Sequence, residues 1–361
     1  MWFNRLEVSN LRNIVHANVD LGPGLNYFHG PNGAGKTTLL EAVYLLARAR
    51  SFRNSDTSTL IRSGTDALVV RGLFDHGGSI ALSRSTQQKT ELKINKTAER
   101  RLSRAAELVP LQLMLPELSN LVFGPPGERR RFLDWGVFHV KPAYLDDLRR
   151  YLRALSQRNS LLKRFGHGVS SDDLDPWSEQ LIETGERIHT ARNEYVQALM
   201  PIFYDVLRKL APELNAELTY HGGWSGEQRF GKVLGEWTAR DVKSGATQVG
   251  PHRADVTIQA DRQAAQKVLS RGQGKMVASA LLVGQAMLLA RRNDKNSIFL
   301  IDDIGAELDL VRNRRFFEIL GELDCQILAS STLEPSVFEA LNVTQKPLTV
   351  FHVEHGAVHR E

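Results

Sequence analysis

The stretch GPNGAGKT, Gly30 to Thr37, is the feature that most restricts how this chain can fold. It matches the pattern G-x-x-x-x-G-K-[S/T] at every fixed position, and it lies between the strand-like run LNYF and the helical run TLLEAVYLLARA. The glycines let the backbone wrap tightly and turn its N–H groups toward one point, while the helix start adds partial positive charge there. The order strand, loop and helix predicts a phosphate-binding loop.

Each residue type in this loop has an expected part in holding ATP. Lys36 is predicted to reach the β- and γ-phosphates, and the Thr37 hydroxyl is predicted to ligate Mg²⁺. A plain glycine-rich turn that caps a helix is the competing interpretation, and the full pattern disfavours it. The predicted nucleotide-binding residues here are Gly30, Pro31, Asn32, Gly33, Ala34, Gly35, Lys36, Thr37 and Thr38.

Hydrolysis also needs acidic groups, and the segment SIFLIDDIGAELD, 297–309, supplies them. Four apolar residues lead into Asp302 and Asp303, as expected at the end of a buried central strand. Asp302 is predicted to hold Mg²⁺ directly or through water, and Asp303 to orient or deprotonate the attacking water. With Lys36 they form the predicted catalytic set. An ordinary strand end capped by acids is the alternative interpretation.

A second anion-binding helix start is predicted in LSRGQGKM, 269–276. Ser270 is placed to cap the following apolar helix, Gly272 leaves backbone N–H groups open, and Gln273 adds a polar side chain. The segment, with Arg271, resembles the signature motif of the ATP-binding-cassette (ABC) class, and GAELD resembles the D-loop of that class. In that class the signature binds the γ-phosphate held by the other subunit. A capped core helix is the alternative.

The order of these motifs is also that of the ABC class: phosphate loop, helical insert, signature and acidic strand. The segment LQLMLPE, 111–117, falls where a Q-loop would join the sheet to the helical lobe. Gln112 is therefore a candidate sensor of Mg²⁺ and the γ-phosphate. A glutamine on the protein surface is the alternative at this position.

The rest of the sequence predicts an α/β head that is interrupted by a helical insert. Residues 66–95 read as an antiparallel meander of three strands, and 141–212 as two amphipathic helices joined by the loop GHGVSSDDLDP. We expect an ABC/SMC-like P-loop ATPase head, with a mixed sheet and an antiparallel β-subdomain, from 1–125 and 245–361. The insert, 126–244, is expected to be an α-helical lobe, although 221–245 gives no clear pattern.

The composition indicates the kind of partner and the cellular compartment that suit this chain. A net charge of +5 and a pI near 9.3 favour anionic partners. One cysteine, Cys325 in an apolar run, fits a reducing cytoplasm and a buried core residue. The longest uncharged apolar run, 276–290, is shorter than the roughly 20 residues of a membrane span. The N-terminus lacks a signal-peptide core. A cytoplasmic protein without membrane contact is expected.

Several segments together resemble the RecF family of bacterial proteins: LEVSNLRNI, LLEAVYLLARARSFR, PPGERRRFLDW, GPHRAD, LSRGQGK and IDDIGAELD. The resemblance implies a cytoplasmic DNA-binding ATPase of replication, recombinational repair and the SOS response. Such proteins share a head with SMC ATPases, dimerise when ATP is bound, and recognise gapped or single-strand/double-strand junction DNA. With RecO and RecR they help load RecA. The resemblance also places Arg12 and Asn13 near the nucleotide.

Two departures from the broader ABC class concern hydrolysis. Asp303 stands where most members have glutamate, and a side chain one methylene shorter predicts slow turnover. The activity is therefore expected to be that of a weak, DNA-stimulated ATPase that works as a switch. The stretch SSTLEPS, where a switch histidine is expected, contains no histidine. Ser331 or Thr332 is a candidate substitute.

The first helix of the insert is a candidate DNA-binding surface because basic residues dominate it. A basic face suits sequence-independent phosphate contacts, while a solvated helix face is the equal alternative. The run ERRR, 128–131, is either DNA-facing or a clamp between lobes. The basic residues of the helix are Lys141, Arg149, Arg150, Arg153, Arg158, Lys163 and Arg164.

Two other functions share parts of this pattern. The ATPase subunit of an ABC transporter has the same three motifs in the same order, but the basic insert and the RRRFLDW junction are foreign to it. A P-loop kinase or GTPase needs no LSRGQ segment, and RNDKNS, 292–297, is a poor match to a guanine-binding box.

Overall fold

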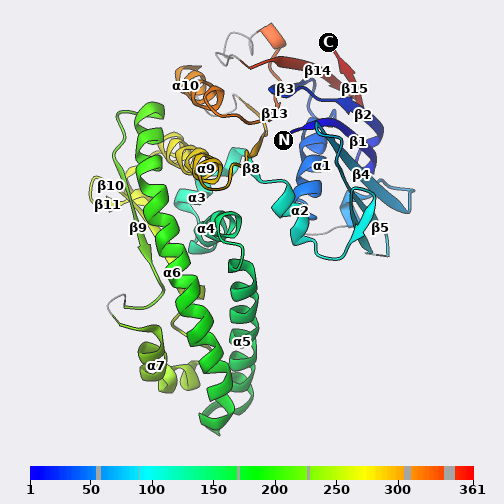
Figure 1. Cartoon of the computed structure of the whole chain (residues 1–361). Helices are drawn as coiled ribbons and strands as arrows, with labels where there is room; N and C mark the ends of the chain where they lie inside the picture. The colour runs from blue at the N-terminus through cyan, green and yellow to red at the C-terminus, as the bar shows by residue number, and fades with distance from the viewer. Residues whose placement is uncertain (54–57, 88, 169–170, 226–227, 305–309, 337–345) are drawn as a thin grey trace. The chain divides into compact units, whose positions relative to one another are not determined.

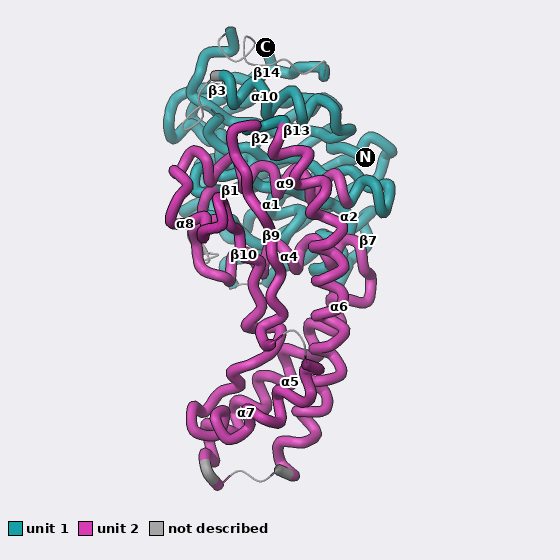
Figure 2. The backbone as a smooth tube through the Cα atoms, turned by 90° about the vertical axis from the view of Figure 1, so that its left-hand side faces the viewer, with its two compact units in different colours: residues 1–118, 209–211, 289–361 teal, residues 119–208, 212–288 magenta. Residues whose placement is uncertain are grey.

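The computed structural model describes residues 1–361 except 54–57, 88, 169–170, 226–227, 305–309 and 337–345. The chain forms two compact units, one of residues 1–118, 209–211 and 289–361, the other of 119–208 and 212–288 (Figure 2). The head predicted from sequence included 245–288, which here belongs to the second unit. The reason is packing, because Gly284 lies against Leu199 and Phe203 of another helix of that unit. The proposed domain boundaries themselves stay a prediction.

The first unit contains a six-stranded mixed sheet in the order β15-β14-β3-β13-β12-β8. Strands β14 to β8 are parallel, and only the edge strand β15 runs antiparallel. Strands β3, β12 and β13 are buried along their whole length, as expected for parallel strands covered on both faces. The strands are β3 (Leu25–His29), β8 (Leu111–Met114), β12 (Ile298–Ile301), β13 (Ile327–Ser330), β14 (Leu348–Glu354) and β15 (Ala357–Arg360).

A second, antiparallel sheet in this unit has the order β2-β1-β4-β5-β6-β7. The predicted meander is confirmed, since β4, β5 and β6 pair antiparallel in sequence order. Alternating burial along β2 and β4 shows that one face of this sheet covers the core. The strands are β1 (Phe3–Leu11), β2 (Ile14–Asp20), β4 (Ala67–Phe74), β5 (Ser79–Ser85), β6 (Thr90–Ile94) and β7 (Thr97–Glu99).

Helix α1 (Lys36–Arg48) is the centre of the first unit (Figure 1). Eleven of its residues are buried, because the helix contacts β1, β4 and β5 of one sheet and β13 of the other. One apolar cluster joins side chains of both sheets to the helix. The loop that begins α1 is thereby fixed to a rigid core. Among the residues that the structure describes, this unit also contains helices α2 (Ser103–Leu108) and α10 (Leu310–Gly321), with 3-10 turns η1 (Ser58–Leu60) and η2 (Pro116–Ser119).

The second unit is mainly helical and has one small antiparallel sheet, β11-β10-β9. Its two long helices are those predicted within 141–212, but the predicted loop between them is wrong from Ser171 onward. Asp172 and Asp173 favour a helix start there, and Pro176 is accommodated within the helix. The elements that lie wholly or mostly in this unit are α3 (Asn120–Phe123), α4 (Pro126–Val140), α5 (Tyr144–Phe165), η3 (Gly166–Gly168), α6 (Ser171–Leu210), β9 (Ala216–His221), α7 (Phe230–Ser244), η4 (Pro251–Arg253), β10 (Asp255–Ala260), β11 (Gln263–Ala264), α8 (Ala265–Val268) and α9 (Arg271–Asn293).

Arginines hold this unit together from within. Arg158 of α5 is 1% exposed and donates to the Asp241 carboxylate and the Thr247 hydroxyl, each at 2.7 Å. Arg192 of α6 donates to Asp134 at 2.7 Å. Buried guanidinium groups need such partners, because an unpaired charge away from water is costly. Arg158, predicted from sequence as one of the basic residues of a DNA-binding helix, is therefore a structural residue instead.

The GPHRAD segment builds a second polar contact in this unit, around the half-buried ring of His252. The Tyr151 hydroxyl lies 2.7 Å from Nδ1 of His252, and Nε2 of the same ring lies 3.0 Å from the Thr247 carbonyl oxygen. Burial lowers the pKa of His252 to about 4, so the ring is neutral at pH 7. Because a carbonyl only accepts, Nε2 carries the proton and the Tyr151 hydroxyl donates to Nδ1.

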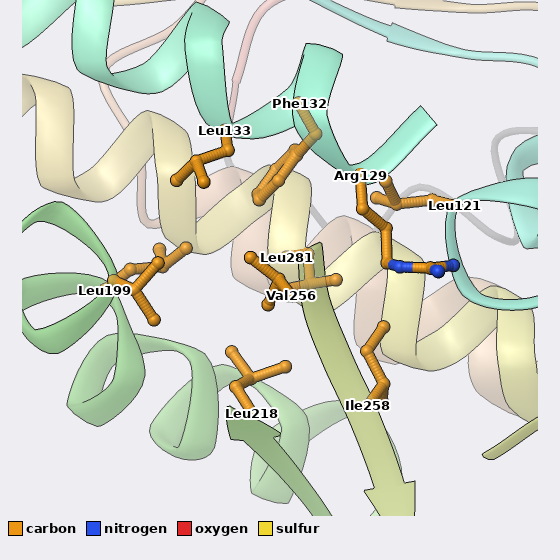
Figure 3. A pocket seen from close by; sticks show the side chains of 10 residues that line it. Leu121, Arg129, Phe132, Leu133, Leu199, Leu218, Val256, Ile258 and Leu281 are labelled. Carbon is orange, nitrogen blue, oxygen red and sulfur yellow. The ribbon is translucent and has the colours of Figure 1, made fainter. Parts of the chain in front are cut away.

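A small apolar pocket lies in the core between α4, α6, α9 and the small sheet (Figure 3). It is lined by side chains such as Phe132, Leu199 and Leu281, and Arg129 contributes its stem. Among the described residues, α9 is the one helix long and apolar enough to cross a membrane, but 78% of its apolar window is buried. That confirms the interpretation of 276–290 as a buried helix. Cys325 is also buried, and burial raises its thiol pKa to about 12.

The buried Arg158 predicts a large stability effect. Replacing it, Arg158→Met, should lower the free energy of unfolding by about 3–5 kcal/mol, because Asp241 is left as an unpaired buried carboxylate. Denaturant unfolding followed by tryptophan fluorescence measures this, since Trp135, Trp177, Trp224 and Trp237 lie in the second unit.

Arg153→Met is the matched control, because Arg153 lies on the same helix and is exposed. It should change stability by no more than about 0.5 kcal/mol. The double variant Arg158→Met/Asp241→Leu should recover much of the loss, since it leaves neither charge buried. If Arg158→Met and Arg153→Met had the same free energy of unfolding, the structural role of Arg158 would be contradicted.

Candidate functional site

A cleft in the first unit gathers most of the residues predicted to bind nucleotide. It lies where the loop after β3, the start of α1 and the ends of β12 and β13 meet, as expected at the carboxyl edge of parallel strands. The lining residues are Arg12, Asn13, Asn32, Gly33, Ala34, Gly35, Lys36, Thr37, Thr38, Arg53, Pro116, Asp302, Asp303, Ser330 and Thr332.

The loop before α1 has the backbone that its sequence predicted. Gly30, Gly33 and Gly35 all have positive φ, which strongly favours glycine. At Gly30 a Cβ would also lie 2.2 Å from the carbonyl oxygen of Val353, so no larger residue fits against β14. Pro31 begins the exposed part of the loop, and the loop is open around Gly33. The loop is thus bare where a ligand would approach.

Lys36 turns its ammonium group back into this loop. Its Nζ donates to the carbonyl oxygens of Gly30 and Pro31, at 2.7 and 2.9 Å. Burial lowers the pKa of Lys36, while the carboxylates of Asp303 and Asp302 act in the opposite direction. The cation therefore lies at the centre of the loop, where an anion would complete its contacts.

The acidic strand end meets the loop through hydroxyl groups. Thr37 Oγ1 donates to Asp302 Oδ1 at 2.9 Å, and Ser330 Oγ donates to the same oxygen at 2.6 Å. The two residues that were each predicted to hold Mg²⁺, Thr37 and Asp302, therefore lie in direct contact. Hydroxyl and carboxylate oxygens are the donors that Mg²⁺ prefers.

Asp303 lies next to this contact but has a different environment. Its φ is +57°, a conformation uncommon outside glycine, and its N–H donates to Ser330 Oγ at 3.1 Å. The residue is exposed at the mouth of the cleft. Strained backbone positions of this kind concentrate at functional sites. Asp302 is thus held by two hydroxyls, whereas the carboxylate of Asp303 faces the open cleft.

The predicted neighbours Arg12 and Asn13 both line the cleft. Arg12 forms two hydrogen bonds to the fully buried carboxylate of Glu41 on α1. Asn13 donates to the carbonyl oxygen of Gly33 at 3.1 Å and accepts from Thr38 Oγ1 at 3.1 Å. The turn between β1 and β2 therefore braces both the loop and the helix that follows it.

Gln112 is not brought to the cleft. It is 2% exposed in β8, opposite Phe299 of β12, which also makes the surface alternative wrong. From the segment 111–117 it is Pro116, four residues after Gln112, that lines the cleft. A role for Gln112 as a γ-phosphate sensor stays a prediction.

The predicted signature segment lies in the second unit and starts α9. Ser270 Oγ accepts from the N–H of Gln273 at 3.3 Å, and Gln273 Oε1 accepts from the N–H of Ser270 at 2.8 Å. This reciprocal pair is a capping box, so the predicted cap is confirmed. Ser270 and Arg271 are exposed, and Gly272 is half-buried. The GAELD segment, 305–309, lies outside the described residues.

Three residues that line the cleft, Arg53, Pro116 and Ser330, were not named as site residues by the sequence analysis. Ser330 ends β13 beside β12, and Arg53 follows α1. The Ser330 position could have been found by aligning the ends of neighbouring parallel strands. Of the two substitutes considered for a switch histidine, Thr332 lines the cleft, whereas Ser331 is buried and donates to the Ile304 carbonyl oxygen at 2.8 Å.

The candidate DNA-binding residues divide into buried and exposed groups. Arg129 forms a two-point ion pair with Asp255, at 2.8 and 2.9 Å, and Arg130 donates to the Ala254 carbonyl oxygen. These arginines of the ERRR run are clamps within the second unit, while Arg131 is exposed. The exposed basic residues of α5 are Arg149, Arg150, Arg153, Lys163 and Arg164.

Comparison with known proteins matches almost the whole chain to one protein family. Residues 2–359 match the family described as RecF/RecN/SMC N terminal domain. The DNA replication and repair protein RecF of Vibrio campbellii is 36% identical over 362 residues, which cover 99% of this chain and 100% of that protein. The match is therefore full-length on both sides.

Solved structures agree with the fold. A structure described as the recombination mediator protein RecF-ATP in the RecFOR pathway superposes with a TM-score of 0.87 at 26% identity, covering 100% of this chain and 97% of that chain. An Smc head domain from Pyrococcus furiosus superposes with a TM-score of 0.60 at 16% identity, covering 100% and 96%. The predicted SMC-like α/β head is thereby confirmed, and the chain belongs to the RecF family of DNA replication and repair proteins.

Proposed function

We propose that this chain is an ATP-dependent, DNA-binding recombination mediator that acts as a slow molecular switch. The observation that carries the proposal is the cleft in which Lys36, Thr37 and Asp302 converge around a bare glycine-rich loop. A relative of matching length is described as a recombination mediator bound to ATP. Family membership gives no support to the ABC-transporter alternative or to a P-loop kinase or GTPase.

Within the cleft, the loop N–H groups and Lys36 would hold the triphosphate. Thr37 and Asp302 would hold Mg²⁺, because their oxygens already lie 2.9 Å apart. The metal would neutralise charge on the β- and γ-phosphates. Asp303 would orient the attacking water from the mouth of the cleft, and its short side chain suits slow hydrolysis stimulated by DNA.

Dimerisation would complete the site. The capping box of Ser270 and Gln273 begins α9 at an exposed position, and a helix start suits the γ-phosphate held by a second copy. An ATP-driven homodimer then follows, with Arg271 and Gly272 at the same contact. Gln112 would report on the nucleotide from β8.

The DNA-binding role would fall to exposed basic residues. Those of α5 suit phosphate contacts with gapped DNA or single-strand/double-strand junctions, with little dependence on sequence. Together with RecO and RecR, the dimer would help load RecA in the cytoplasm during repair, replication and the SOS response. The pathway named for the solved relative supports this setting.

Removing the loop cation tests the central claim. Lys36→Met should abolish ATP-dependent dimers and the DNA binding that depends on them, because the loop then loses the cation that its own carbonyl oxygens hold in place. Sedimentation velocity with and without ATP and gapped DNA measures both. Lys93→Met, at an exposed lysine of β6, should behave as wild type. ATP-dependent dimers of Lys36→Met would refute the proposal.

Asp303 is expected to act in hydrolysis and not in binding. Asp303→Asn should slow phosphate release by about 100-fold or more, while ATP still drives dimerisation. Asp324→Asn, at an exposed carboxylate, is the control and should hydrolyse ATP normally. An unchanged rate for Asp303→Asn would remove this residue from the mechanism, and a fast wild-type rate would contradict a switch.

The contact in trans can be tested by complementation. Ser270→Arg should keep ATP binding to single chains but lose dimers, because its bulk and charge occupy the γ-phosphate contact. Ser270→Ala controls for loss of the helix cap, worth about 1 kcal/mol. Mixing Ser270→Arg with Lys36→Met should restore one intact composite site and hence mixed dimers. If Ser270→Arg dimerises like wild type, the signature does not act in trans.

A further inference from the structure

A cluster of metal-ligating side chains lies on the face of β3 opposite the apolar cluster that includes Phe28 and α1. His29 ends β3, His352 lies beside it in register on β14, and Glu361 follows β15. One ligand atom from each of the three residues lies within 4.8 Å of the others. The nucleotide cleft uses none of these groups.

Strand pairing explains why the three side chains share one face. Paired residues of neighbouring strands project to the same side, and successive residues alternate. Phe28 and Phe351, one residue before each histidine, stack with ring centroids 5.0 Å apart and belong to the core cluster. The histidines therefore project away from the core. The N–H of Glu361 donates to the Val350 carbonyl oxygen, which extends the pairing to the acid.

The hydrogen bond between His29 and Glu361 accounts for two of the three groups, and Nε2 of His352 also lies 3.6 Å from Oε2 of Glu354. Nε2 of His29 lies 3.0 Å from Oε1 of Glu361, which would satisfy one imidazole. The second imidazole, His352, approaches edge-on with ring centroids 5.0 Å apart. His29 is 7% exposed, whereas the side chains of His352 and Glu361 are 36% and 45% exposed. Two of the three ligands are thus open to an entering ion.

Two imidazoles and one carboxylate form a ligand set that zinc uses in sites with an open coordination position. Tetrahedral geometry with ligand bonds near 2.1 Å places ligand atoms roughly 3.4 Å apart, and the present atoms lie within 4.8 Å of one another, so a bound ion would draw them closer together. Imidazole donors favour Zn²⁺, Co²⁺, Ni²⁺ or Cu²⁺ over Mg²⁺. We infer that His29, His352 and Glu361 form a site for a divalent transition metal of the zinc class, with water in the remaining position.

The place of the site gives it a consequence for the phosphate loop. Gly30, the first glycine of the loop, directly follows His29 and contacts Val353 of β14. The turn of the β14–β15 hairpin donates from Gly356 N–H to the Ala34 carbonyl oxygen at 2.8 Å. A metal joining β3, β14 and the residue after β15 would clamp this hairpin against the loop.

The test is titration of the chelator-treated full chain with Co²⁺, followed by its visible absorption. Wild type should bind one Co²⁺ with the absorption of a four-coordinate site, and Zn²⁺ should displace it. His352→Ala and Glu361→Gln should each weaken binding by roughly tenfold or more, since each removes a direct ligand. Zn²⁺ should raise the unfolding midpoint of wild type and not of His352→Ala.

Two controls separate this site from other binding. His355→Ala removes a 94% exposed histidine from the same hairpin and should bind as wild type. Asp302→Asn and Lys36→Met should also keep the signal, so failure of the proposed ATP function and failure of this site are distinguishable. Loss of the signal in Asp302→Asn would place the cobalt in the nucleotide cleft. That outcome, unchanged binding by Glu361→Gln, or no saturable binding by wild type would overturn the inference.

Discussion

One carboxylate oxygen connects the parts of the nucleotide cleft. Asp302 Oδ1 accepts from Thr37 at the start of α1 and from Ser330 at the end of β13. Three segments that are distant in the sequence therefore meet at one atom. The contact exists only because β3, β13 and β12 are parallel neighbours whose carboxyl ends share an edge. Because these strands are buried on both faces, the core fixes their ends, and the cleft is organised before any ligand enters.

The parts of the site predicted from sequence are those whose chemistry is local. The phosphate loop needs glycines at positions of positive φ, and Gly30, Gly33 and Gly35 have them. The capping box of Ser270 and Gln273 needs two polar residues three positions apart, so it too can be recognised from a short stretch. The buried strand before Asp302 is likewise encoded in four consecutive apolar residues. In each case one segment contains both the signal and its physical cause.

The features that sequence reasoning missed depend on partners far along the chain. Arg158 has the pattern of an exposed basic residue until Asp241, 83 residues away, is placed beside it. Ser330 has the pattern of an ordinary strand residue until Asp302 is adjacent. The segment 245–288 has the mixed helix and strand pattern of the head, yet its helix α9 packs on α6 of the second unit. A single sequence does not give such pairings, because burial and charge compensation are properties of the fold.

The C-terminal hairpin shows how a distant segment can control a local motif. Glycine-rich loops pay a large entropic cost when they become ordered. Here β14 contacts Gly30, the hairpin turn binds Ala34, and Asn13 binds Gly33. Part of that cost is therefore met on folding and not on ligand binding. Lys36 completes the arrangement by binding the carbonyl oxygens of its own loop. An arriving triphosphate would exchange contacts within an ordered loop, which favours binding that responds to nucleotide without refolding the site.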